Sequence, residues 1–332
     1  MDQQGIGMSR TQFLIINGPL VIFCLVVNIF FVFCLGCPQS NDKGLKQPLK
    51  LLLEFLSWCS ILYLILLVVN WSLTFGNFNR LYIVLWFILL FYVHNSMSAY
   101  VWLTFYYFTQ IVPARHALFV WLRRNIKVTI FMAVLLDFLV VFYNYALETA
   151  HFLINWPLLI NDNLTLTLIT IHSNSHTTFL SLVGFIIGKV YMMTTLCIMI
   201  ISSFTTLRYL HGHMRKLEKS GIPVSASRLR SRLRVTLLGI CQSVIFFSCM
   251  TFNFIDSLTL RYADFFFGAH IGFTVSTLYI FGTTVNMAIG QSTFRQRAAA
   301  LWWALKTQCS VGTGTNDLMP ESADMAKIVT AT

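Results

Sequence analysis

Charged residues are scarce in this chain of 332 residues. Asp, Glu, Lys and Arg together make up 11% of it, whereas 57% is hydrophobic and the mean hydropathy is +0.71. A soluble domain carries roughly 25% charged residues, because charge covers its surface. None of these four residue types occurs from Leu81 to Ala114 or from Phe265 to Phe294. This scarcity excludes an ordinary soluble enzyme, a secreted disulfide-rich domain and a disordered chain, and it indicates a polytopic membrane protein.

Several motifs of catalysis and nucleotide binding are also lacking. The chain contains no Walker loop, no G-x-G-x-x-G turn and no H-E-x-x-H pair. His211 and His213 lie two residues apart and would point in different directions on a helix, and His172 and His176 lie in an outer loop. We therefore expect no enzyme activity, no cofactor and no metal site.

Long apolar segments are what the sequence does contain. A helix needs about 20 apolar residues to cross the hydrocarbon region of a bilayer. Seven segments qualify, and they are Phe13–Leu35, Leu51–Leu73, Leu81–Ile111, Val128–Leu147, Thr178–Leu207, Val235–Leu258 and Phe265–Gly290. The fold class predicted is an all-α membrane protein, a seven-transmembrane helix bundle. The odd number of spans fits poorly with transporters built from two repeated halves.

The basic residues give the orientation of the bundle. Nineteen of the 23 lie in the connectors after spans one, three and five or in the C-terminal tail, and three, Arg10, Arg80 and Arg261, lie on the opposite side. Basic residues stay on the cytoplasmic side, so we expect an extracellular N-terminus and a cytoplasmic C-terminus in the plasma membrane. The net charge of +11 thus reflects topology and not a nucleic-acid partner.

The chain divides into four parts on this interpretation. Residues 1–12 form an extracellular N-terminus, residues 13–291 the helix bundle, residues 292–306 an amphipathic helix and residues 307–332 a disordered cytoplasmic tail. Apolar residues recur at helical spacing between 292 and 306, and two of them are Phe294 and Trp302. This pattern is typical of a helix that lies at the membrane surface as a short eighth helix.

Two connectors carry further predictions. The outer loop from Glu148 to Thr178 contains the sequon Asn163-Leu164-Thr165, so we expect glycosylation at Asn163. The inner connector after span five is basic on both sides of a Ser-Gly-Ile-Pro turn, which predicts two helical extensions joined by that turn. Its basic face could rest on anionic lipid, dock a cytoplasmic protein, or do both.

Three ionisable residues lie within the predicted spans. Lys189 lies about three turns below the outer end of span five, where it could either reach a ligand cavity or extend toward the outer interface. Asp137 lies near the middle of span four and could accept hydrogen bonds that hold helices together. Glu54 begins span two, and we interpret it as an interfacial residue beside Lys50.

Polar and aromatic residues gather in the outer halves of spans three, five, six and seven. Aromatic rings with a few polar groups form cavities suited to amphipathic organic molecules. We predict a ligand site there, with Lys189 as its polar anchor, Asp256 as a partner for that lysine and Trp102 as an aromatic floor. The predicted set is His94, Ser98, Trp102, Lys189, Asn253, Asp256, Phe273 and Ser276.

Three segments of the predicted inner face carry a family resemblance. Tyr106–Ile111 followed by Phe119–Arg123 resembles the Phe-Tyr-x-x-Lys-Ile and Phe-x-Trp-Leu-Lys runs of type 2 (bitter) taste receptors. Leu210–Leu217 resembles the basic start of the third inner loop in that family, and Gly290–Gln296 follows the spacing of its Gly-Asn-x-Lys-Leu-Lys-Gln signature. Asn28 matches the asparagine of its first span.

The sequence also departs from the family pattern. Trp58 follows Ser57 where the family has Ser-Arg, Ile280 replaces a proline and Thr283 replaces a histidine. Ser98 stands where a pocket tryptophan is usual, and Trp102 lies one turn deeper. These departures suggest a divergent member, with a non-mammalian source as one option.

The resemblance implies a G-protein-coupled receptor that binds a small bitter compound from outside and activates a heterotrimeric G protein, gustducin or an inhibitory-class relative. It places the G-protein contacts at the inner ends of spans three, five and six, for which we predict Tyr107, Gln110, His213, Arg215 and Arg234. The alternatives are a type 1 vomeronasal receptor and a small-molecule transporter or channel. The sequence leaves the oligomeric state open.

Overall fold

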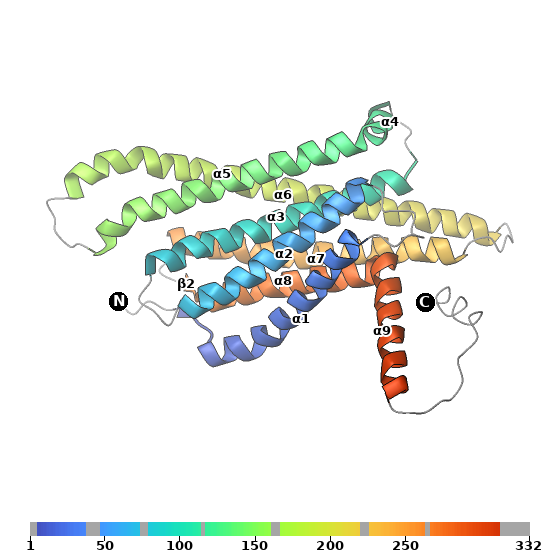
Figure 1. Cartoon of the computed structure of the whole chain (residues 1–332). Coiled ribbons are helices and arrows are strands. Elements are labelled where there is room, and N and C mark those ends of the chain that lie inside the picture. Colours follow the sequence, from blue (N-terminus) through green and yellow to red (C-terminus); the bar gives the residue numbers. More distant parts are fainter. Residues whose placement is uncertain are drawn as a thin grey trace.

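The computed structural model describes residues 5–37, 47–73, 79–113, 117–160, 167–219, 226–262 and 266–312, and these residues are almost entirely helical (Figure 1). The elements are β1 (Gly5–Ile6), α1 (Arg10–Gly36), α2 (Gln47–Leu73), α3 (Asn79–Ile111), α4 (Ala117–Arg124), α5 (Ile126–Ile160), α6 (Thr167–Lys219), α7 (Ala226–Tyr262), β2 (Phe266–Phe267), α8 (Ala269–Gly290) and α9 (Ser292–Gly312). The long apolar helices agree with the predicted all-α membrane fold.

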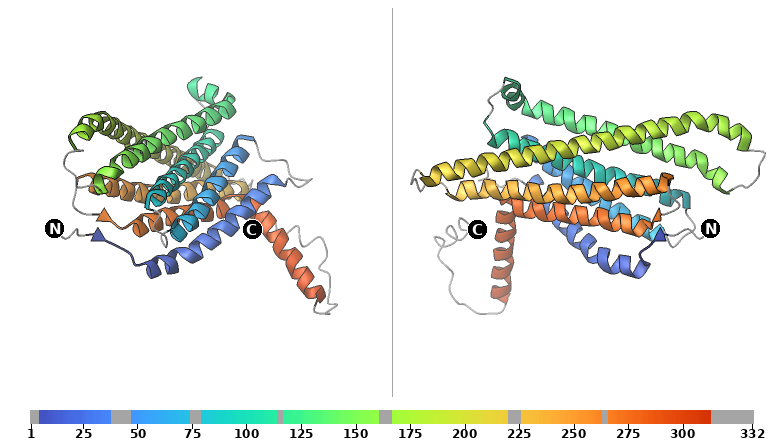
Figure 2. Two further views of the ribbon diagram at one scale, coloured as in Figure 1. Left: turned by 60° about the vertical axis from the view of Figure 1, so that its left-hand side comes forward. Right: turned by 180° about the vertical axis from the view of Figure 1, so that it is seen from behind.

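Seven of these helices form a closed ring of neighbours. Each of α1, α2, α3, α5, α6, α7 and α8 packs against the next in that order, and α8 packs back against α1. α3 also contacts α6 across the ring, so it lies closest to the centre of the bundle (Figure 2). Short connections between antiparallel neighbours produce this arrangement in helix bundles.

The distribution of apolar side chains is the one that a bilayer requires. Large apolar residues such as Ile15 on α1 and Leu136 on α5 are exposed on the outside of the bundle, whereas polar residues such as Asn28 and Thr277 are fully buried inside it. Lipid tails solvate apolar surface, so an apolar exterior is stable there and would not be in water. Six helices, α1, α2, α3, α5, α6 and α7, are long and apolar enough to cross a membrane in the part of the chain described.

α8 is the helix expected as the seventh span. Its 22 residues extend about 33 Å at 1.5 Å per residue, which is enough to cross the hydrocarbon region. Many of its side chains are polar, and two of them bind α1: Asn17 donates to Thr274 at 2.8 Å and Asn28 donates to Thr284 at 2.9 Å. The seventh crossing stays a prediction that the length and packing of α8 support.

The N-terminal segment is fixed to the segment that precedes α8. β1 pairs with β2 in parallel, with Gly5 opposite Phe266 and Ile6 opposite Phe267. Ser9 then caps α1, because its hydroxyl accepts from the backbone N–H of Gln12 while the Gln12 side chain accepts from the N–H of Ser9. This reciprocal capping box explains why the helix begins at Arg10.

The outer ends of α5 and α6 correct one expectation. The segment from Glu148 to Thr178 was expected as a loop, but α5 continues to Ile160 and α6 begins at Thr167. The two helices therefore extend well beyond the other outer ends of the bundle (Figure 1). Asn163, the predicted glycosylation site, lies outside the described residues.

The inner connectors differ from one another in how well they were predicted. α6 continues to Lys219 and α7 begins at Ala226, which confirms the two helical extensions, while the turn between them lies outside the described residues. α4, a two-turn helix between α3 and α5, was not predicted from the sequence.

Glu54 and Lys50 form the expected pair on α2, with Nζ of Lys50 3.5 Å from Oε1 of Glu54.

α9 leaves the bundle at a steep angle after Gln291 (Figures 1 and 2). Its first turn is attached to α1, because the ring of Phe294 stacks on Phe31 with centroids 4.2 Å apart and Arg297 donates to the carbonyl of Cys34. Trp302 is 69% exposed, as an interfacial helix requires. The predicted boundary at 306 was wrong, since the helix continues to Gly312.

Candidate ligand cavity and inner face

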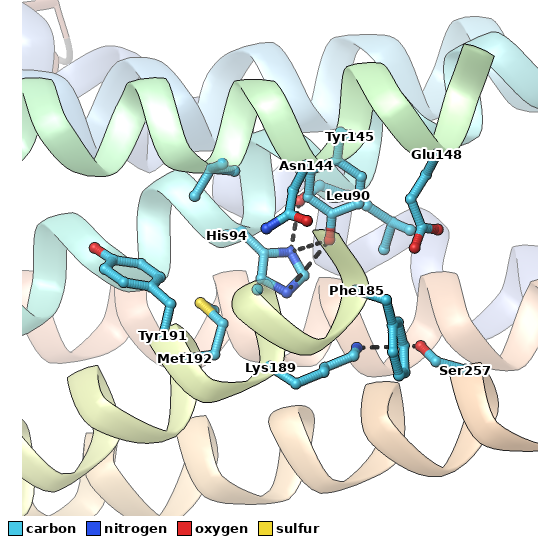
Figure 3. A pocket seen from close by; sticks show the side chains of 12 residues that line it. Leu90, His94, Asn144, Tyr145, Glu148, Phe185, Lys189, Tyr191, Met192 and Ser257 are labelled. Carbon is cyan, nitrogen blue, oxygen red and sulfur yellow. Dashed lines mark hydrogen bonds between the residues drawn. The ribbon is translucent and has the colours of Figure 1, made fainter. Parts of the chain in front are cut away.

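A small cavity lies among the outer halves of α3, α5, α6 and α7 (Figure 3). Its volume is about 80 Å³, which holds a few water molecules and is smaller than the roughly 300 Å³ of a typical site for drug-sized ligands. An organic ligand of that size would need the helices to separate. The residues that line it are Leu90, His94, Val141, Asn144, Tyr145, Glu148, Phe185, Gly188, Lys189, Tyr191, Met192 and Ser257.

His94 on α3 is a predicted site residue that the cavity includes. Its Nδ1 lies 2.8 Å from the carbonyl oxygen of Leu90 and 2.8 Å from the hydroxyl of Tyr145, whose oxygen is also 3.4 Å from Nε2. A carbonyl can only accept, so Nδ1 carries a proton in this geometry and Nε2 is the nitrogen left to accept from Tyr145. The imidazole is thereby fixed between α3 and α5.

Lys189 on α6 is the second predicted residue at the cavity. Its ammonium donates to the hydroxyl of Ser257 on α7 at 3.1 Å, and it lies 5.2 Å from the ring centre of Phe185 (Figure 3). Lys189 therefore bonds to the neighbouring helix α7. The hydroxyl that accepts from it belongs to the residue after Asp256, the partner that the sequence analysis predicted.

A buried carboxylate lies deeper than the cavity. Asp137 on α5 is 2% exposed and accepts hydrogen bonds from Ser98 and Trp102 of α3 and from Tyr191 of α6. This confirms the interpretation of Asp137 as a hydrogen-bonding partner between helices. Ser98 and Trp102 were predicted as ligand contacts, but the structure directs both toward Asp137 and neither lines the cavity.

The remaining predicted ligand residues do not line the cavity. Asn253 donates to the carbonyl of Cys249 one turn before it on α7. Phe273 on α8 is buried against the ring of Trp86, 4.8 Å away, and Ser276 is buried on the same helix. The cavity therefore includes two of the eight predicted residues, His94 and Lys189, and Asp256 on α7 lies close enough to Lys189 for the two charges to interact, as predicted.

The inner face holds the residues predicted to contact a G protein. Tyr107 on α3 accepts a hydrogen bond of 2.5 Å from Gln291, at the junction of α8 and α9. Gln110, one turn further along, lines a cavity of about 420 Å³ together with Gln47, Pro48, Tyr106, Arg123, Ile126 and Lys127. In this conformation Tyr107 is thus part of a contact between helices.

The α6 residues of this predicted set are accessible. His213 and Arg215 are exposed near the inner end of α6, and the ring of His213 lies 6.2 Å from that of Tyr209. Arg234 lies in the first turns of α7, and its side chain is outside the described part.

The family of the chain follows from comparison with known proteins. The model of the family described as taste receptor protein (TAS2R) matches residues 6–306. The chain belongs to this family. No curated protein matches the receptor significantly.

The family is one of G-protein-coupled receptors and not of enzymes, and the receptor is accordingly a membrane protein. Among the residues that the structure describes, no three His, Cys, Asp or Glu side chains form a group that could hold a metal ion. Cys34 and Cys37 have C-x-x-C spacing, and both are free thiols.

The departures from the family pattern have structural counterparts. Thr283, at the position of the family's histidine, is buried and accepts a hydrogen bond of 2.7 Å from Gln242 of α7. The side-chain oxygen Oε1 of Gln242 in turn accepts from the side-chain amide of Asn286 at 2.6 Å. Ile280, at the position of the proline, is fully buried in an unbroken helix. A chain of polar groups thus joins α7 to α8 at the place where the signature differs.

Sequence reasoning missed the contribution of α5 to the cavity. Asn144, Tyr145 and Glu148 lie at i, i+1 and i+4 directly after an apolar run of α5, so they share one face. That spacing was the signal that could have identified them. It was overlooked because the ligand site was predicted on spans three, five, six and seven, which are α3, α6, α7 and α8. α5 is the fourth span.

Proposed function

We propose that this receptor detects small bitter organic compounds that reach it from outside the cell and transmits the signal to a heterotrimeric G protein. The observation that carries the proposal is the cavity between α3, α5, α6 and α7, with fixed polar groups and apolar walls. Such a combination orients an amphipathic ligand while burying its apolar part.

The basic asymmetry of the connectors supports the orientation required. With the N-terminus outside, the cavity lies in the outer half of the bundle and the exposed His213 and Arg215 lie in the cytoplasm. A ligand can shift the receptor only if it binds one arrangement of the helices better than the other. The small volume of the cavity explains how an agonist would meet this condition, because an agonist that needs more room binds better to a more open arrangement of the helices.

The contacts on the inner face support coupling to a G protein through the same preference for one arrangement of the helices. Tyr107 is bonded to Gln291, so an opening of the inner ends would break that contact and release the tyrosine. A G protein that binds the released surface favours the same arrangement as the agonist, and the two are thereby coupled. Gustducin or a related inhibitory-class protein is the partner that we propose.

The test is a G-protein activation assay in transfected cells, with a panel of bitter compounds applied to the full-length chain. Activation by at least one compound, absent from cells without the receptor, is the expected result. Epitope tags report the topology: an N-terminal tag should bind antibody on intact cells, and a C-terminal tag only after permeabilisation. The reverse tag pattern would contradict the receptor orientation, and a correctly oriented receptor that responds to no compound would contradict the ligand class.

A further inference from the structure

Asn144 is the polar side chain of the cavity whose role the contacts within the protein do not explain. His94 is bonded to Tyr145, Lys189 to Ser257, and Tyr191 to Asp137. The half-buried amide of Asn144 forms no hydrogen bond with any of the described residues, although it has two donors and an acceptor. A polar group in such a site calls for a partner from water or from a ligand.

The amide of Asn144 lies against the backbone of α6. A Cβ atom at Gly188 would lie 2.4 Å from Nδ2 of Asn144, and one at Gly184 would lie 3.3 Å from its Oδ1. The amide therefore lies along two glycines one turn apart, in space that any larger side chain at 188 would occupy. With one side against α6, its remaining surface faces the cavity that it lines (Figure 3).

The two charged side chains that line the cavity have opposite signs. Lys189 on α6 carries a positive charge and Glu148 on α5 a negative one, and the two lie on facing helices of the same cavity. An ion of either sign would meet one repulsive charge there. A neutral ligand with a strong local dipole fits this balance better.

An asparagine amide presents its donor and its acceptor side by side. The group that matches both at once is an N–H adjacent to a C=O on the same edge, as in a lactam or a cyclic urea. The side chains of Leu90, Val141 and Met192 supply apolar walls for the rest of such a molecule. We propose that Asn144, positioned by Gly188, contacts the ligand and pairs with an uncharged cyclic amide through a donor and an acceptor together. This inference rests on the proposed function.

A matched pair of probes tests the proposal. ε-Caprolactam offers both the N–H and the C=O, whereas N-methyl-ε-caprolactam keeps the carbonyl and the apolar ring but has lost the N–H. In the G-protein activation assay with the full-length receptor, we expect the half-maximal concentration of ε-caprolactam to be at least tenfold lower than that of its N-methyl counterpart.

Variants assign that difference to Asn144. Asn144→Leu should raise the half-maximal concentration of ε-caprolactam at least tenfold and change that of the N-methyl compound by less than twofold. Asn125→Leu removes an asparagine that directly precedes α5, at the inner end of the bundle, and should change neither value. Surface labelling with antibody verifies that each variant reaches the membrane. If Asn144→Leu fails to reach it, Asn144→Gln, which retains the amide on a longer side chain, is the second variant to measure.

The outcomes separate this inference from the proposed function. Equal potency of the two lactams, or an equal loss of both in Asn144→Leu, would overturn the pairing. A receptor that responds to other bitter compounds but to neither lactam would also overturn it while leaving the proposed function intact. A receptor that is present at the surface and responds to nothing would instead count against the proposed function itself.

Discussion

The three hydrogen bonds to Asp137 give a prediction whose size can be worked out. Ser98, Trp102 and Tyr191 each donate to this one carboxylate, so Asp137→Ala leaves three donors from α3 and α6 without their acceptor. Hydrogen bonds between membrane helices average about 0.6 kcal/mol and reach about 1.7 kcal/mol in double-mutant cycles. The three together therefore correspond to a loss of roughly 2–5 kcal/mol in the free energy of unfolding.

The assay is thermal unfolding of the purified receptor in detergent, with the surface level in cells as a second measurement. The single variants Ser98→Ala, Trp102→Phe and Tyr191→Phe each remove one of these hydrogen bonds and should each lower the free energy of unfolding by about 0.6 kcal/mol. In the Asp137→Ala background the same three changes should have almost no further effect, because the acceptor has already been removed. If they cost as much there as in the unmodified receptor, the carboxylate does not hold the helices together and the reasoning is refuted.

Three further predictions concern the outer segment, the cavity and the inner face. Asn163→Gln should abolish a glycosidase-sensitive shift on a gel, and a wild-type receptor without such a shift would contradict glycosylation at this site. Lys189→Met keeps the apolar stem but loses the bond to Ser257, so it should raise half-maximal agonist concentrations at least tenfold, about 1.4 kcal/mol; unchanged responses to several unrelated agonists would remove Lys189 from the site. Neutral substitution of Arg215 together with Arg234 should reduce G-protein activation at an unchanged surface level, whereas a loss of surface receptor would favour a role in lipid contact and topology.

The sequence predicted the fold well because the physical signals are long and simple. Apolar runs longer than a bilayer crossing predicted the helices. The inner side, which the distribution of basic residues indicates, stays a prediction. The outer segment after Glu148 was wrongly expected to be a loop, since its Asn, Ser, Thr and His residues have low helix propensity. The ends of α5 and α6 are helical nonetheless, as continuations of two long helices that pack against each other.

The cavity was only partly predictable for a different reason. Sequence position gives the depth of a residue in a span, but in a helix that is apolar on all sides it does not give the rotation about the helix axis. Nor does it give what the facing helix presents: His94 and Ser98 share one face of α3, yet His94 lines the cavity and Ser98 binds Asp137 of α5. Asn144 faces the cavity because glycines on α6 leave room for it, a property of two helices that neither sequence segment displays by itself.

The ladder between β1 and β2 bears on the order in which the receptor assembles. Its partners lie just before α1 and just before α8, the first and the last helix of the ring: Gly5 pairs with Phe266 and Ile6 with Phe267. The N-terminal segment therefore has no partner until the chain has been synthesised as far as Phe266, and the pairing closes a loop of more than 250 residues. A nascent chain cut short before Phe266 would also lack α8, so the other helices would form an open row, and the ring would close only once α8 had been added.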